Sequence, residues 1–222
     1  MSKKIAFIGD SLFRGSRNIP TIVSNILKNK HKILNSSIYG LKITKNLLNE
    51  KNSWCNNNDI IKFKPNIIII MLGTNNVNDN DFNVNTILKN YKYILKILTN
   101  INNPHIFICL PPPIYLYEFF KKFCNDDEKS MCQLYTKYFL KNKEFEKKNE
   151  IIKFLNIIEE FQSLKNMEFQ NIEIIDVFNN SFQTNYYIDD IHLSYHGMDM
   201  IGCFIVDEIK KFFGQIYGNW NL

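Results

Sequence analysis

The chain has 222 residues, and we expect one domain over 1–222 with a substantial buried core. Its formal net charge is +5, but the lysines are spread along the chain, which argues against a nucleic-acid or membrane footprint. No apolar run reaches 18 residues, and Gly9-Asp10 interrupts the first apolar stretch, so we expect no membrane span and no secretory signal. Five cysteines without a C-x-x-C pair favour a reduced, cytoplasmic setting.

Short apolar segments alternate with longer stretches of helical periodicity, which is typical of a parallel sheet with crossover helices. One segment, 67–72, is apolar at every position, as expected for a central strand buried on both faces. We predict strands at 4–8, 31–36, 66–72, 105–110 and 172–177. We predict helices at 18–29, 41–50, 84–100, 130–165 and 196–213. The expected fold class is α/β, with a central parallel sheet of about five strands.

A charged and aromatic region at about 115–170 is longer than a simple crossover requires. It follows Pro111-Pro112-Pro113, which forbids helix for several residues. We predict that 115–170 is a mostly helical insertion within the single domain. Because it is rich in Phe, Tyr and Lys, it motivates an alternative function, a non-catalytic binding or scaffold domain that uses this segment to bind a partner.

Ser11 stands in a tight turn at the end of the first predicted strand. A fold presents a nucleophile above the end of a sheet in this way, but a free serine hydroxyl needs an adjacent general base. A lone serine after a strand is most often a turn or helix cap. Ser11 is therefore a candidate nucleophile only if other segments of the chain supply its partners.

His192 is the candidate base, because imidazole titrates near neutral pH. Asp189 precedes it by three residues, a spacing that brings a carboxylate to the imidazole Nδ1 on a tight turn. Asp190 is the rival partner, but its adjacency to His192 makes a side-chain bond awkward. The alternatives are a surface turn capped by aspartate, with His192 incidental, or a zinc site of Asp189, His192 and His196.

Acyl transfer also needs hydrogen-bond donors for the developing oxyanion. Asn75 follows the third strand and its Gly73 turn, and Gly40 follows the second strand, where a residue without Cβ brings its N–H close to a ligand. The Ser11 N–H is the third candidate donor. For Asn75 the alternative is a turn asparagine without function. All these residues fall on the rim where open parallel sheets bind ligands.

The sequence resembles the SGNH, or GDSL-type, family of esterases and lipases. Gly9-Asp10-Ser11-Leu12 matches the first block of the family, and Asn35 to Gly40 resembles the second. Gly73-Thr74-Asn75-Asn76 resembles the third block, and Asp189 to Ser194 resembles the fifth. The chain departs from the pattern at Asn76, where Asp is frequent, and at Asp190, where Gly is frequent. The resemblance covers most of the chain outside 115–170.

The resemblance implies a flavodoxin-like three-layer α/β/α sandwich and a serine esterase that works through an acyl-enzyme. It implies a triad and an oxyanion hole, with no metal and no organic cofactor. It also suggests candidate substrate-binding residues and a small-molecule ester substrate, such as a lipid or an acetylated sugar, with a short or medium acyl group. The residues implied are Ser11, His192 and Asp189 for the triad, Ser11, Gly40 and Asn75 for the oxyanion hole, and Asp10, Leu12, Asn76 and Pro112 for substrate binding.

Overall fold

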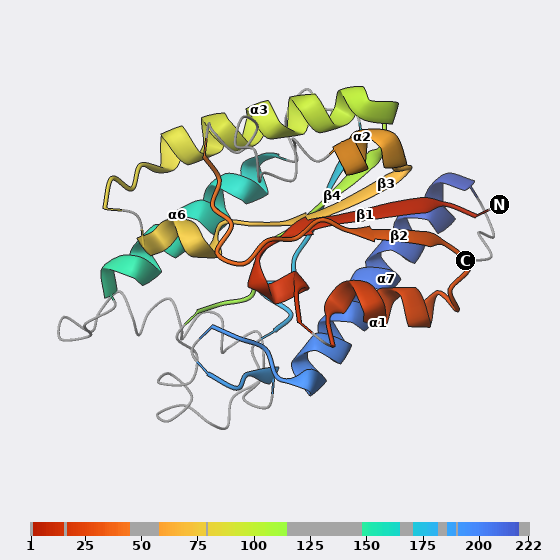
Figure 1. Ribbon diagram of the computed structural model, residues 1–222. Coiled ribbons are helices and arrows are strands. Elements are labelled where there is room, and N and C mark those ends of the chain that lie inside the picture. Colours follow the sequence, from red (N-terminus) through yellow and green to blue (C-terminus); the bar gives the residue numbers. More distant parts are fainter. Residues whose placement is uncertain are drawn as a thin grey trace.

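A five-stranded parallel sheet forms the centre of the protein in a computed structural model (Figure 1). The strand order is β2-β1-β3-β4-β5, and every neighbouring pair is parallel. The strands are β1 (Lys4–Gly9), β2 (Lys32–Asn35), β3 (Ile67–Met71), β4 (His105–Cys109) and β5 (Ile172–Ile175). The structure describes residues 2–15, 17–44, 58–78, 80–114, 148–164, 171–181, 186–189 and 191–217.

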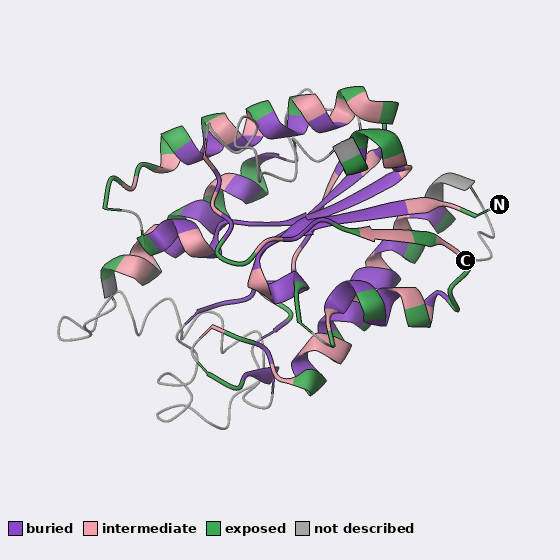
Figure 2. Ribbon diagram, in the orientation of Figure 1, coloured by how far each residue is buried: buried purple, intermediate pink, exposed green. Residues whose placement is uncertain are grey.

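All five predicted strands are confirmed, and so is the α/β class. The central strand β3 is buried at every position, which explains why its sequence is continuously apolar rather than alternating (Figure 2). The edge strand β2 has no buried residue and carries lysine at its first position. The hydrophobic pattern therefore separates the centre of the sheet from its edge.

Helices cover both faces of the sheet (Figure 1). On one face, α1 (Ile19–Ile26) packs against α7 (Tyr195–Tyr217), and on the other lie α2 (Asn58–Phe63), α3 (Val84–Asn102) and α6 (Lys148–Ser163). The helices predicted at 18–29, 84–100 and 196–213 correspond to α1, α3 and α7. Of the predicted 130–165 helix, the part within the described residues is α6, and 130–147 lies outside them.

The helix predicted at 41–50 is wrong over its described part. Residues 41–44 have no helical structure, because the Asn76 side chain bonds to the backbone of Ile43, and residues 45–50 lie outside the described residues. The structure instead has α2 at Asn58–Phe63, which the sequence reading did not predict. A tertiary contact outweighed the local helical periodicity of this segment.

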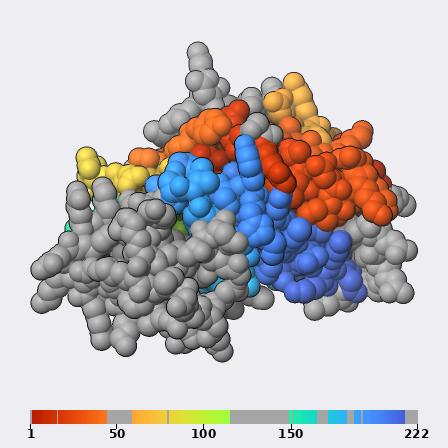
Figure 3. Space-filling model, turned by 90° about the horizontal axis from the view of Figure 1, so that it is seen from below, coloured from red at the N-terminus to blue at the C-terminus, as the bar shows by residue number. Residues whose placement is uncertain are grey.

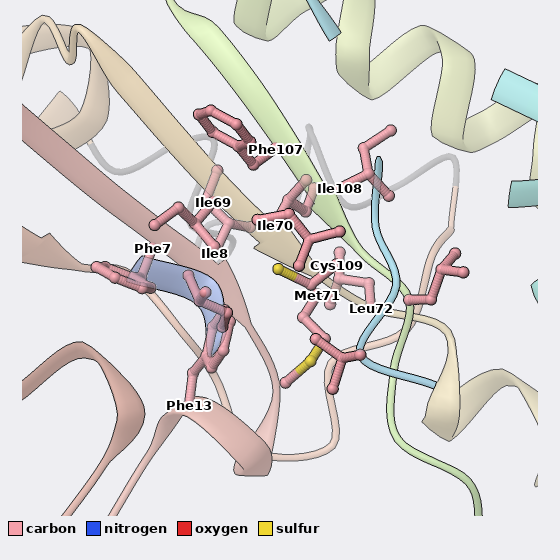
Figure 4. Close-up of a cluster of buried hydrophobic side chains, with 14 of the residues drawn as sticks. Phe7, Ile8, Phe13, Ile69, Ile70, Met71, Leu72, Phe107, Ile108 and Cys109 are labelled. Carbon is pink, nitrogen blue, oxygen red and sulfur yellow. The ribbon is translucent and has the colours of Figure 1, made fainter. Parts of the chain in front are cut away.

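The core reaches the carboxyl ends of the central strands, where it supports the turn that carries Ser11 (Figure 4). This turn is a short 3-10 helix, η1 (Ser11–Phe13), whose Leu12 and Phe13 side chains are buried. The Phe13 ring packs edge-on against Phe7 of β1, with 5.4 Å between the ring centroids. Anchoring on both sides of the turn fixes the backbone of Ser11 relative to the sheet.

Among the described residues, no helix has the length and apolar character needed to span a membrane.

Candidate active site

The Ser11 turn is capped by the residue before it. Asp10 is the N-cap of η1, and its Oδ1 accepts a hydrogen bond from the Leu12 N–H at 3.0 Å. Backbone bonds from Phe13 to Asp10 and from Arg14 to Ser11 close the turn. The Ser11 side chain is half-buried, and its hydroxyl makes no hydrogen bond to any described residue. The fold therefore holds the serine backbone firmly and leaves its hydroxyl available.

Asp10 also joins the ends of β1 and β3. Its Oδ2 accepts a hydrogen bond from Asn75 Nδ2 at 2.9 Å, and the same nitrogen donates to the Leu41 carbonyl at a longer 3.3 Å. Burial raises the pKa of Asp10 to about 6, although N–H donors from Leu12 and Asp10 itself and the charge of His192 oppose that rise. The structure thus brings three of the predicted site residues into one region: Asp10, Ser11 and Asn75.

Asn76 lies beside Asn75 but turns into the protein. It is almost fully buried, its Oδ1 accepts from the Ile43 N–H at 2.9 Å, and its Nδ2 donates to the Ile43 carbonyl at 3.3 Å. These bonds fasten residues 41–44 to η3 (Thr74–Asn78), the 3-10 helix that carries both asparagines. Leu12 and Pro112 are also buried. We therefore assign Asn76 and Leu12 to the support of the site.

Gly40 lies on an exposed turn after β2, with a left-handed backbone φ of 67°. A side chain at this position would be strained by that conformation, which explains the glycine. The Gly40 N–H donates no hydrogen bond to any described residue. The turn is tied to the site because Ile38 N–H donates to the Gly9 carbonyl at 3.0 Å.

Asp189 and His192 are in direct contact on the turn that leads into α7. Asp189 Oδ2 lies 2.9 Å from His192 Nδ1, and Asp189 Oδ1 accepts the N–H groups of Ile191 and His192 at 2.8 and 2.7 Å. Desolvation raises the pKa of Asp189, but these hydrogen bonds and the charge of His192 outweigh it, and the net pKa is lowered. An ionised Asp189 holds the imidazole by Nδ1, and the His192 side chain is about half exposed. Asp190 lies outside the described residues.

Close packing fixes this turn on α7. Tyr187 and Leu193 form an antiparallel bridge, and the Ser194 N–H donates to the Tyr186 carbonyl at 2.7 Å. A Cβ on Gly197 would lie only 2.2 Å from the Tyr186 carbonyl oxygen, so this position requires glycine. The His192 backbone is therefore as firmly placed as that of Ser11.

The charge of His192 opposes the rise in the pKa of the Asp10 carboxyl next to Ser11, which indicates that the imidazole and the Ser11 turn lie at the same end of the sheet. The segments that carry these residues, in red and light blue, meet on one face of the molecule (Figure 3). Within the described residues, neither the Ser11 hydroxyl nor His192 Nε2 makes a hydrogen bond, so the structure does not join them directly. Such bonds are often long in enzymes without substrate.

The alternative zinc site required Asp189, His192 and His196 to converge. In the described parts of the chain, no three His, Cys, Asp or Glu side chains gather as metal ligands. The His196 ring instead packs edge-on against Tyr186, with 5.4 Å between the ring centroids. His196 therefore belongs to the packing that supports the turn.

The sequence profile of one family, described as GDSL-like Lipase/Acylhydrolase, matches residues 5–203 of the chain. The chain belongs to the GDSL-like lipase/acylhydrolase family. It is accordingly a hydrolase that acts on ester bonds. Among curated proteins, none matches the chain by sequence.

Solved structures of low sequence identity share the fold. A lipase/acylhydrolase from Enterococcus faecalis has a TM-score of 0.65 and 16% identity, with 95% of this chain and 96% of that chain covered. An acetyl xylan esterase, AlAXEase, has a TM-score of 0.62 and 18% identity, with 93% and 99% covered. Est24, a carbohydrate acetylesterase from Sinorhizobium meliloti, has a TM-score of 0.62 and 16% identity, with 96% and 100% covered.

The sequence did not predict that Asp10 accepts a hydrogen bond from Asn75. Asp10 was predicted to contact substrate, whereas it is 1% exposed and both of its carboxylate oxygens accept hydrogen bonds within the protein. The position of Asp10 directly before a turn was a usable signal, because aspartate at this place caps the N–H two residues on. Its second bond, to a residue 65 positions away, has no local signal.

Proposed function

We propose that the protein hydrolyses carboxylic esters through an acyl-enzyme, with Ser11 as nucleophile, His192 as base and acid, and Asp189 as orienting carboxylate. The observation that carries this proposal is the 2.9 Å contact between Asp189 Oδ2 and His192 Nδ1, on a chain segment that meets the segment of Ser11 on one face of the molecule. An aspartate on Nδ1 selects the tautomer that leaves Nε2 free to accept a proton.

In the first step, Ser11 Oγ attacks the ester carbonyl carbon while His192 Nε2 takes the serine proton. The tetrahedral intermediate then expels the alcohol, which takes the same proton from His192 as it leaves. Water attacks the resulting acyl-enzyme and gives its proton to His192, and collapse of the second intermediate releases the acid and restores Ser11. Rotation of the exposed imidazole and the half-buried hydroxyl would have to form the hydrogen bond between them when substrate binds.

The oxyanion of each intermediate would be bound by the N–H groups of Ser11 and Gly40 and by the Asn75 amide. The Gly40 N–H is available because no described residue accepts it. Asn75 donates a short bond to Asp10 and a longer one to Leu41, and the oxyanion would replace the longer one. Asp10 thus acts as a positioning residue that sets the direction of the amide.

We further propose that the acyl group is short or medium in length. Two of the similar solved structures are named as esterases of acetyl groups, the acetyl xylan esterase and the carbohydrate acetylesterase. The mouth of the site at Gly40 and His192 is exposed, which suits a small acyl group and a bulkier alcohol. An acyl-length series from acetyl to palmitoyl tests this part of the proposal.

The decisive experiment combines turnover with covalent labelling. Wild type, Ser11→Ala and the control Ser163→Ala would be assayed with p-nitrophenyl acetate and butyrate and treated with a fluorophosphonate probe. We expect loss of turnover and of labelling in Ser11→Ala alone, because Ser163 is an exposed serine at the end of α6. Equal turnover by Ser11→Ala and wild type, or labelling at another serine, would refute the mechanism.

A further inference from the structure

The two arginines of the chain both lie in the loop that follows the Ser11 turn. The sequence has 27 Lys and Arg residues, and only Arg14 and Arg17 are arginine. The planar guanidinium presents five N–H donors that bind carboxylate and phosphate groups in a bidentate manner, which an ammonium group does not reproduce. The use of arginine here, in a chain that otherwise uses lysine, suggests a specific anion partner for each.

Arg17 has its partner within the protein. Its guanidinium forms an ion pair with Asp199 of α7, and it also lies 5.6 Å from the ring centroid of Tyr195. These contacts join the loop after Ser11 to the helix that follows His192. The charge of Arg17 is therefore balanced by Asp199, and Arg17 has a structural role in joining the loop to α7.

Arg14 lacks such a partner. Its guanidinium lies 5.1 Å from the ring centroid of Tyr39, and it forms no ion pair with any described residue. Arg14 and Tyr39 are both exposed, and Tyr39 is 62% exposed. Stacking on an aromatic ring restrains the guanidinium and leaves its in-plane N–H groups free. The result is an oriented cation for which the described part of the chain supplies no anion.

This cation is tied to the proposed oxyanion hole from both sides. The backbone N–H of Arg14 donates to the Ser11 carbonyl at 3.1 Å, and Tyr39 directly precedes Gly40 in the sequence. The Tyr39 turn is closed by a bond from Leu41 N–H to the Ile38 carbonyl at 3.2 Å. The Arg14–Tyr39 pair therefore lies at the rim of the site, on the turns that carry Ser11 and Gly40.

We propose that Arg14, stacked on Tyr39, binds an oxyanion of the substrate, a carboxylate or a phosphate group, next to the scissile ester. This inference rests on the proposed function and narrows it, because it makes the substrate a small anionic ester. A neutral ester would leave the Arg14 donors to water, whereas an anionic ester would gain charge-assisted hydrogen bonds at the rim.

The test compares esters of matched length that differ only in the terminal group. The three substrates are 4-nitrophenyl butyrate, mono-4-nitrophenyl succinate and 4-nitrophenyl 3-phosphonopropanoate, which end in methyl, carboxylate and phosphonate. For each variant, the ratio of kcat/KM for an anionic ester to that for butyrate is measured. We expect Arg14→Gln to lower at least one of the two ratios about ten- to a hundredfold, a typical effect of losing a charged hydrogen bond. The ratio that falls identifies the anion.

Two control variants sharpen the comparison. Lys96→Gln removes one positive charge from an exposed position on α3, so the ratios should stay within about twofold of wild type. Arg14→Lys keeps the charge but loses the stacked fork, and we expect an intermediate ratio. Unchanged ratios in Arg14→Gln, or an equal fall in Lys96→Gln, would overturn the inference.

A binding measurement separates this inference from the proposed function. Calorimetric titration of Ser11→Ala with phenyl hydrogen succinate, phenyl 3-phosphonopropanoate and phenyl butyrate reports anion binding without catalysis. We expect tighter binding of an anionic ester, and loss of that difference in Ser11→Ala/Arg14→Gln. If wild type hydrolysed no ester but this difference persisted, the proposed function would fail and the anion site would stand. Equal binding of all three esters would overturn the anion site alone.

Discussion

The two ends of the sheet hold their ionisable side chains in different ways. At the amino ends of the strands, His31 Nδ1 accepts a backbone N–H from Lys3, and the buried atoms His31 Nε2 and His105 Nδ1 have no partner among the described residues. At the carboxyl ends, the Asp10 side chain is bonded to the Asn75 side chain, and Asp189 is bonded to His192. A bond between two side chains fixes the direction of both groups, whereas a bond to the backbone fixes only one. The comparison indicates that the relative geometry of ionisable groups is specified at the carboxyl end.

The largest expected effect is at the carboxyl end. His192→Gln should lower kcat on a p-nitrophenyl ester by on the order of a thousand- to ten-thousandfold, because it removes the proposed base. The matched change at the amino end, His31→Gln, should leave kcat within about twofold. Steady-state kinetics of both variants, with circular dichroism to confirm folding, measures the difference. Comparable losses in the two variants would mean that the ends are not functionally distinct.

Adjacent asparagines give the next contrast. Asn75→Ala should lower kcat on the order of a hundred- to a thousandfold with little change in KM, since it removes a proposed oxyanion donor. Asn76→Ala should instead lower the free energy of unfolding by roughly 2–4 kcal/mol, because it leaves the buried N–H and carbonyl of Ile43 unpaired.

Urea unfolding and kinetics of the two asparagine variants together test this division. Asn75→Ala should lower the midpoint less than Asn76→Ala does, because it removes one donor from the buried Asp10 carboxyl, whereas Asn76→Ala leaves two buried backbone groups unpaired. If Asn76→Ala were stable but inactive, Asn76 would belong to the chemistry and Asn75 would not. The pair therefore distinguishes support from catalysis within two consecutive residues.

The sequence was sufficient for the strands because their signal is local. A continuous apolar run such as 67–72 predicts a strand buried on both faces, whichever strands lie beside it. The three-residue spacing also led to the pairing of Asp189 with His192 that the structure has. By contrast, helix was wrongly predicted for 41–44, the described part of the 41–50 segment, since the contact of Ile43 with Asn76 spans 33 positions. The Asp10–Asn75 bond was missed for the same reason, because long-range polar pairing leaves no periodicity to read.

At the carboxyl ends of the strands, the titration of Asp10 should make the stability of the protein depend on pH. Its pKa of about 6 lies above the unfolded value near 3.8, so the folded protein binds the proton more tightly. Stability should therefore rise by about 2 kcal/mol as the pH falls from 6 to 4, out of about 3 kcal/mol for the whole shift of about two pH units. Chemical unfolding of wild type and Asp10→Asn at pH 8, 6 and 4 isolates the effect. A constant difference between the two proteins would show that Asp10 is not desolvated.

At the amino ends of the strands, the stability contributed by His105 should change with pH in the opposite direction, and this is the smallest of the expected effects. Burial lowers the pKa of His105, as does the charge of Lys3, while Glu173 opposes the change. The unfolded chain then binds the proton more readily, so stability contributed by neutral His105 is lost as pH falls below about 6.5. His105→Phe keeps the edge-on packing against Phe212 and Phe213 of α7 and removes the titration. Wild type should therefore lose stability relative to His105→Phe as the pH falls from 7 to 5. A gain of wild-type stability relative to His105→Phe over the same fall in pH would contradict the assignment.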